Sequence, residues 1–135
     1  VTQRNGVSLA ALGKAMAETT AAAAAKGGEP AELAVQLDST WQRLVTVTTN
    51  MFGSGDIDAA LANSVIYLEA FGHIVIAWIW LEQFVAADGQ SGDFYDGKRQ
   101  ACRYFFRWEL PRTGPQFDLL ASLDDTTLAM RDDWF

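Results

Sequence analysis

Residues 63–84 are apolar on nearly every side of a helix, and Glu69, Gly72 and His73 are the interruptions. The helix-length periodicity on both sides of this run, and the lack of other strand-like segments, favour one long helix over a strand at 74–81. A helix that is hydrophobic all round belongs in the interior of a protein. We therefore expect this segment to form the buried central helix of the fold.

Segments with helical periodicity lie on both sides of this central run. Leu33, Leu37, Trp41 and Leu44 recur every three or four residues, which is typical of the core-facing side of a helix. The predicted helices are 8–26, 30–52, 57–87 and 93–110, with Asp56 as the N-cap of the third and a short last helix at 115–123. Short loops between long helices favour antiparallel neighbours. The sequence thus predicts an all-α, up-down-up-down four-helix bundle with a short extra C-terminal helix and tail, as one domain over residues 1–135.

The charge balance and the cysteine content limit the classes of partner and the cellular compartment that we expect. The chain has 17 acidic and 10 basic residues and a net charge of −7, which argues against a nucleic-acid partner. Cys102 is the only cysteine, so no disulfide can form within the chain, and a reducing, cytoplasmic setting is expected. The chain begins at Val1 with a polar stretch unlike a signal peptide, and we expect it to be a piece of a longer polypeptide.

The apolar run is too short and too interrupted for a membrane span. Only residues 74–81 are apolar without interruption, whereas a span needs roughly 20 apolar residues. Extending the segment to Val65 would place Glu69 and His73 near the bilayer centre, where polar groups are costly. We expect no membrane span.

Glu69 and His73 are four residues apart and share a helix face. They could form half of a metal site or a carboxylate-oriented base, or a hydrogen-bonded polar pair inside the bundle or at its edge. A di-metal bundle site needs further Glu-x-x-His ligands on facing helices, and the chain has a single His. We therefore favour a buried structural pair and assign no catalytic residue and no metal ligand. Gly72 is expected to permit a close helix approach, so Gly72→Leu should cripple folding.

Two features are candidates for interaction. Arg99, Arg103 and Arg107 repeat every four residues and could grip a phosphate or an acidic partner surface. The alternative, which the acidic chain favours, is a solvated face whose arginines pair with its own carboxylates. Trp134 and Phe135 end an acidic tail, and two large aromatic residues there favour docking onto a groove or another chain.

The other residues that could take part in catalysis or ligand binding give weaker indications of function. Cys102 has aromatic neighbours, so buried packing is expected rather than a nucleophile. The acidic pairs at 124–125 and 132–133 lack the alternating pattern of an EF-hand and favour a solvated tail. The sequence contains no Gly-rich phosphate loop and no GxSxG motif, so no cofactor-binding residue is assigned.

Two stretches share their order and spacing with a known family. The first is Asn63-Ser-Val-Ile-Tyr-Leu-Glu-Ala-Phe-Gly-His, followed by Ala77-Trp78. The second is Asp93-Phe-Tyr-Asp-Gly-Lys, followed by Arg103-Tyr-Phe and ending in Glu109-Leu-Pro. Together they resemble the extra C-terminal domain that follows the catalytic domain in a large subgroup of acyl-CoA dehydrogenases. The resemblance covers about residues 30–135, and the alanine-rich first helix matches weakly.

The resemblance implies a parent enzyme that is a flavoprotein. Such an enzyme removes hydrogens from Cα and Cβ of an acyl-CoA thioester and passes electrons to an electron-transfer flavoprotein. Its FAD and its catalytic glutamate would lie in the preceding domains, so Glu69 is not that base. The chain itself is expected to be non-catalytic, to contact the catalytic domains of the parent chain, and to help assemble a homo-oligomer or shield the active-site region.

Two other hypotheses remain beside this one. A free-standing helical module could bind a hydrophobic ligand or a partner protein, and it predicts a cavity among Trp78, Trp80 and Phe105. A metal-dependent enzyme would centre on Glu69 and His73. We favour the accessory domain of an acyl-CoA dehydrogenase.

Overall fold

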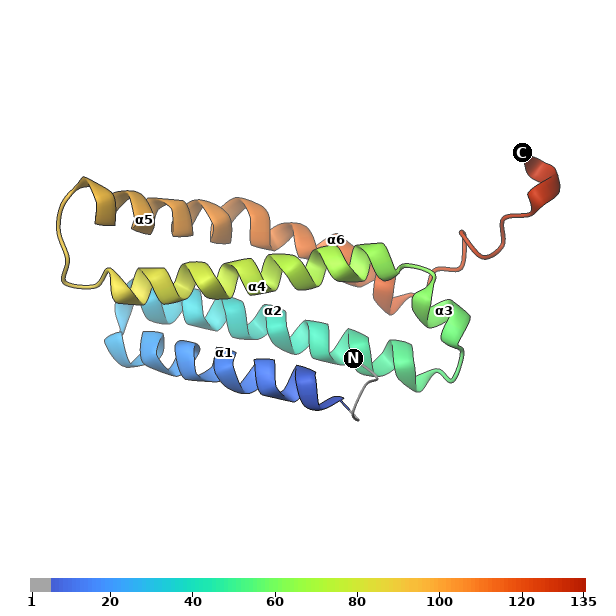
Figure 1. Ribbon diagram of the computed structural model, residues 1–135, viewed down its shortest axis with the longest axis horizontal. Coiled ribbons are helices and arrows are strands. Elements are labelled where there is room, and N and C mark those ends of the chain that lie inside the picture. The colour runs from blue at the N-terminus through green and yellow to red at the C-terminus, as the bar shows by residue number, and fades with distance from the viewer. Residues whose placement is uncertain (1–5) are drawn as a thin grey trace.

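Four long helical segments run alternately up and down the long axis of the computed structural model, which describes residues 6–135 (Figure 1). They are α1 (Val7–Lys26), α2 (Gly28–Gly53), α4 (Ser64–Ala86) and α5 (Asp93–Tyr104). α5 continues through a π-helical segment (Phe105–Glu109) and a 3-10 turn (Leu110–Arg112) into α6 (Thr113–Ala121). The short helix α3 (Ile57–Leu61) joins α2 to α4, and another 3-10 turn (Asp132–Trp134) lies near the C-terminus. The predicted all-α bundle is confirmed, while the polar start at residues 1–5 lies outside the described part.

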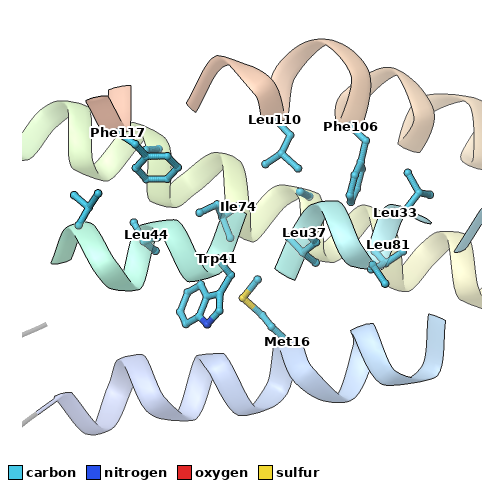
Figure 2. Packing of buried hydrophobic residues seen from close by; sticks show 14 of the residues in the cluster. Met16, Leu33, Leu37, Trp41, Leu44, Ile74, Leu81, Phe106, Leu110 and Phe117 are labelled. Atoms are coloured by element: carbon cyan, nitrogen blue, oxygen red, sulfur yellow. The ribbon is translucent and has the colours of Figure 1, made fainter. Parts of the chain in front are cut away.

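α2 and α4 pack against each other at the centre of the bundle. α1 contacts both of them, as does α6, and α5 packs on α4. Leu37 and Leu44 of α2 meet Ile74 and Leu81 of α4 in a fully buried layer, and Phe106 closes this layer from the π segment (Figure 2). Burying each such side chain contributes roughly 1.5–3 kcal/mol, so this layer fixes how the helices pack.

α4 is buried along only one face, so the prediction of burial on all sides is wrong. The core face carries Ala70, Ile74, Ala77, Leu81 and Phe84. On the opposite face Val65, Leu68, Ile76 and Ile79 are 70%, 69%, 46% and 44% exposed. The reason is geometric: α1, α2, α5 and α6 surround the inner side of α4, and among residues 6–135 no further layer covers its outer side.

By length and composition alone, α4 is apolar enough to cross a membrane, although one such helix is weak evidence. In the structure α4 packs against four other helices, α1, α2, α5 and α6, as a member of the bundle. Glu69 and His73 lie near its middle, as the sequence indicated. A bilayer would make both costly, and the lack of a span stays a prediction.

Two of the predicted helices are interrupted, and the short last helix predicted at 115–123 is α6, at Thr113–Ala121. The predicted helix at 57–87 is broken at Asn63, whose backbone leaves the helical conformation and whose side chain donates to the carbonyl oxygen of Asp124 at 2.8 Å. The predicted N-cap is confirmed, since Oδ1 of Asp56 accepts from the backbone N–H of Ala59 at 3.0 Å. The predicted helix at 93–110 instead widens into the π segment. A wider turn suits side chains spaced by four residues, and Cys102, Phe106 and Leu110 are all buried there.

Gly72 does not lie at a close helix contact. A Cβ built at this position meets no other atom within 4 Å, so the expectation that Gly72→Leu cripples folding is wrong. The close approach is at Gly13 of α1 instead, where a Cβ would lie 3.1 Å from the Trp41 ring of α2. Sequence position along the most hydrophobic helix was therefore a poor guide to where two helices touch.

Candidate functional site

The predicted arginine row does not form one continuous basic surface. Arg99 folds back onto the loop after α4 and donates to the carbonyl oxygens of Ala87 and Gln90 at 2.7 and 3.1 Å. Arg103 reaches α2 and donates to both carboxylate oxygens of Glu29, at 2.6 and 2.8 Å. These two guanidinium groups therefore connect parts of the bundle, as in the alternative of arginines that pair with the chain's own groups.

Arg103 and Glu29 also alter each other's protonation. The hydrogen bonds from Arg103 lower the pKa of Glu29 below its ordinary 4.5, and Glu29 raises the pKa of Arg103. Arg107 differs from the other two, because within residues 6–135 it has no ion-pair partner. It is exposed and lines an open groove of about 520 Å³ together with Glu32 and Pro111. Contact with a partner through this row stays a prediction, and Arg107 is the member free to make it.

Glu69 and His73 do not pair through their side chains. Nδ1 of His73 donates to the backbone carbonyl of Glu69 at 2.9 Å, and Nε2 lies 3.6 Å from Oε2 of Glu109. The exposed Glu69 carboxylate accepts instead from Nε2 of Gln116 in α6, at 3.1 Å. The predicted buried pair is thus corrected to two contacts at the edge of the bundle, because the outer side of α4 is uncovered.

Glu109 is held by a second partner beside His73. Arg112 donates to its carboxylate at 3.1 Å, and this bond, with a smaller contribution from His73, lowers the pKa of Glu109 below 4.5. A carboxylate with a lowered pKa is a weak proton acceptor near neutral pH. No three His, Cys, Asp or Glu side chains in residues 6–135 gather as possible metal ligands. The contact between His73 and Glu109 joins α4 to the π segment, and we assign it a structural role.

The aromatic residues predicted to share a cavity lie on different sides of α4. Trp78 donates to Oγ1 of Thr19 at 2.7 Å, beside a groove of about 410 Å³ between α1 and α4. Trp80 faces α5, where the Lys98 ammonium lies 5.5 Å from the centre of its ring. Phe105 belongs to the π segment, also away from α1. These three residues do not enclose one ligand cavity.

Exposed aromatic side chains lie along α5 and the π segment. They are Phe94, Tyr104 and Trp108, named here the α5 aromatic surface. The rings of Tyr104 and Trp108 stack with their centroids 6.4 Å apart, and Arg107 lies between them in sequence. Exposed aromatic residues next to arginine are typical of anchors in protein interfaces. The pattern of the sequence did not separate these residues from the buried aromatics of the same helix.

The outer face of α4 is the second exposed apolar surface. Val65, Leu68, Ile76 and Ile79 form it, and they are named here the α4 stripe. The acidic and basic residues of α4 all have partners on other elements: Glu69 in α6, His73 in the π segment and Glu82 in α1. The stripe is therefore flanked by polar contacts but contains no charge.

The C-terminal tail leaves the bundle after α6 (Figure 1). Asn63 and Thr127 tie its first part to the α3–α4 turn, through hydrogen bonds of 2.8 and 3.5 Å. Trp134 and Phe135 are exposed, and Arg131 lies over the Trp134 ring at 6.0 Å. They fill no groove of their own bundle, so their docking onto another chain stays a prediction.

Cys102 is fully buried, as its aromatic neighbours predicted. Burial raises the pKa of its thiol to about 12. The thiol is therefore neutral at physiological pH and serves as packing between the helices, since the thiolate is the nucleophilic form.

The bundle, its two exposed apolar surfaces and most of the tail fall within one family match. A family described as "Acetyl-CoA dehydrogenase C-terminal like" matches residues 9–131. The chain belongs to this family. The match confirms the resemblance in α4 and α5, and it also takes in α1, where the resemblance was weak. Comparisons with curated proteins and with solved structures found no match.

Proposed function

We propose that the chain is the C-terminal helical domain of an FAD-dependent, cytoplasmic acyl-CoA dehydrogenase that acts in fatty acid oxidation. In this proposal the domain is itself non-catalytic, and it supports assembly of the catalytic domains or shields their active-site region. The family match over residues 9–131 is the observation that carries the proposal. The parent enzyme would oxidise the Cα–Cβ bond of an acyl-CoA and pass the electrons to an electron-transfer flavoprotein.

The arginine row and its groove, within residues 6–135, do not fit a flavin dinucleotide. A diphosphate needs cationic or N–H donors, but Arg99 is engaged by backbone carbonyls and Arg103 by Glu29. The groove beside Arg107 also contains two glutamates, which would repel phosphate. FAD is therefore assigned to the domains that would precede this one, and no step of the reaction is assigned to residues of the bundle.

The α5 aromatic surface supports the assembly role. Tyr104 and Trp108 present stacked rings to solvent, and Arg107 lies between them in sequence. Aromatic side chains of this size bury about 150–250 Å² each when covered, so covering them would contribute strongly to an interface. Trp134 and Phe135 add a second aromatic anchor on a tail that can reach away from the bundle.

Two measurements test this function. In calorimetric titrations of the 135-residue chain with FAD and with a medium-chain acyl-CoA, we expect no binding of either. The protein from the complete reading frame should hold flavin and reduce an artificial electron acceptor when given acyl-CoA. Micromolar binding of FAD by the chain alone would overturn the proposal, as would a complete protein without flavin.

A matched pair of variants tests the contact in the complete protein. Tyr104→Ala together with Trp108→Ala should release flavin or lower the fraction of assembled enzyme, because both rings are proposed to lie at the interface. Val35→Ala removes an equally exposed apolar side chain from α2 and should leave both readouts unchanged. Equal effects of both changes would count against the α5 aromatic surface as the contact.

A further inference from the structure

The α4 stripe is symmetric about one residue. Its four exposed side chains lie seven and four residues before Gly72, and four and seven residues after it. Offsets of four and seven return to the same side of an α-helix, so Gly72 lies at the middle of the stripe and on its central line. The stripe spans residues 65–79, about 21 Å at 1.5 Å per residue. In Figure 1 the whole length of α4 is in view, with no described segment crossing in front of it.

Contacts among residues 6–135 do not explain why glycine occupies this central position. Glycine in the middle of a helix is less favourable than alanine by roughly 1 kcal/mol. A Cβ at Gly72 would meet no atom within 4 Å, in contrast to Gly13, where the Trp41 ring leaves no room. A missing side chain at the centre of an exposed apolar face would let the backbone of another helix come close.

We propose that two copies of the chain associate through the α4 stripe, with a two-fold axis passing beside Gly72. In this arrangement the two α4 helices are antiparallel and cross at their glycines. The two-fold axis then places Leu68 of each copy against Ile76 of the other, and Val65 against Ile79. This is the reciprocal pairing that an isologous dimer requires.

The symmetry of the stripe selects a second copy as the occupant. Across a two-fold axis, each residue on one side of the axis meets the residue at the same distance on the other side, so the two must be complementary. The apolar pairs 68 with 76 and 65 with 79 meet this requirement. Three of the four side chains are β-branched and lose little rotamer freedom when they are covered. The glutamates and the histidine of α4 are directed to neighbouring helices, so no charge has to be buried.

Charge and interface size determine how strongly the two copies associate. Each copy carries a net charge of −7, so two copies repel at long range, and added salt should strengthen the dimer by screening this repulsion. The stripe has four apolar side chains, whereas a stable interface has about 20–30 residues on each side, so we expect a weak dimer with a dissociation constant in the micromolar range.

The test uses a residue that would meet itself across the axis. Gly72→Glu and Gly72→Lys each place two like charges face to face, and neither should disturb the fold because the position is open. By sedimentation equilibrium, the unmodified chain should dimerise, and each variant alone should associate at least tenfold more weakly. An equal mixture of the two variants should dimerise again, because opposite charges then meet. Val35→Lys, at a similarly exposed apolar position on α2, is the control and should dimerise like the unmodified chain.

Three results would overturn the proposal. The first is an unmodified chain that stays monomeric up to about 1 mM, which would assign the stripe to another occupant such as a catalytic domain. The second is a dimer that Gly72→Glu leaves intact. The third is loss of association in both variants without recovery in the mixture. All of these are measured on the chain alone, without flavin, so they are independent of the proposed dehydrogenase function.

Discussion

At the scale of single residues, Arg103 of α5 and Glu29 of α2 form an ionic contact between helices. Both carboxylate oxygens of Glu29 accept hydrogen bonds from Arg103, and the pKa of Glu29 is lowered. A lowered pKa means that the pair stabilises the fold above pH 4.5 and that this stability is lost as pH falls through the folded-state value. Both side chains are about 40% exposed, so Glu29→Gln should lower the free energy of unfolding at pH 7 by only roughly 0.5 kcal/mol.

Urea denaturation at pH 7 and at about pH 3 checks this prediction. The difference in stability between Glu29→Gln and the unmodified chain should be larger at pH 7 than at the acidic pH. Glu32→Gln removes a carboxylate from the same groove with no hydrogen bond to Arg103, and it should change nothing. A loss of stability of the same size at both pH values would show that Glu29 acts through something other than its charge.

Residue types predicted some of these roles and not others. Cys102 as packing and Asp56 as a cap follow from local surroundings and were confirmed. The partner of Arg103 lies 74 residues away, so no local pattern could identify it. The pairing of Glu69 with His73 was predicted from a spacing of four, but spacing fixes the face of a helix and leaves the partner open.

At the scale of elements, periodicity gave the helices and their order, but it did not show which faces would be covered. The hydrophobicity of α4 predicted full burial, whereas the bundle covers only its inner side. Gly13 and Gly72, both inside helices, illustrate the same difficulty. Gly13 lies in a segment of small residues and has a tight neighbour, while Gly72 lies in the most apolar segment and has none.

Alanine at each of these glycines tests the assignment. Gly72→Ala should raise the free energy of unfolding by roughly 0.5–1 kcal/mol, because alanine favours the helix and its Cβ meets nothing. Gly13→Ala should give a free energy of unfolding about 1 kcal/mol less favourable than this gain. The reason is that its Cβ would press on the Trp41 ring at 3.1 Å. Thermal or urea unfolding should be measured at concentrations where the chain is monomeric. Equal gains at both positions would show that α1 and α2 can separate slightly at no cost.

At the scale of the whole molecule, the bundle and the tail are energetically separate. The tail is tied down at its start, by Asn63 to the carbonyl of Asp124 and by Thr127 to Ala62, and beyond that its apolar side chains are exposed. Deleting residues 128–135 should therefore change the free energy of unfolding by less than about 0.5 kcal/mol. Asn63→Ala, in contrast, should lower it by about 1 kcal/mol, because it leaves the carbonyl of Asp124 without its donor.

Urea denaturation of the two variants distinguishes these expectations. A loss above about 1.5 kcal/mol on deletion would mean that Trp134 and Phe135 dock onto the bundle in solution, since covering two such rings has effects of that size. Unchanged stability would leave the predicted docking onto another chain as the use for these two rings. In the complete protein the same deletion should then weaken assembly while the bundle stays folded, and this combination would distinguish a binding role of the tail from a role in folding.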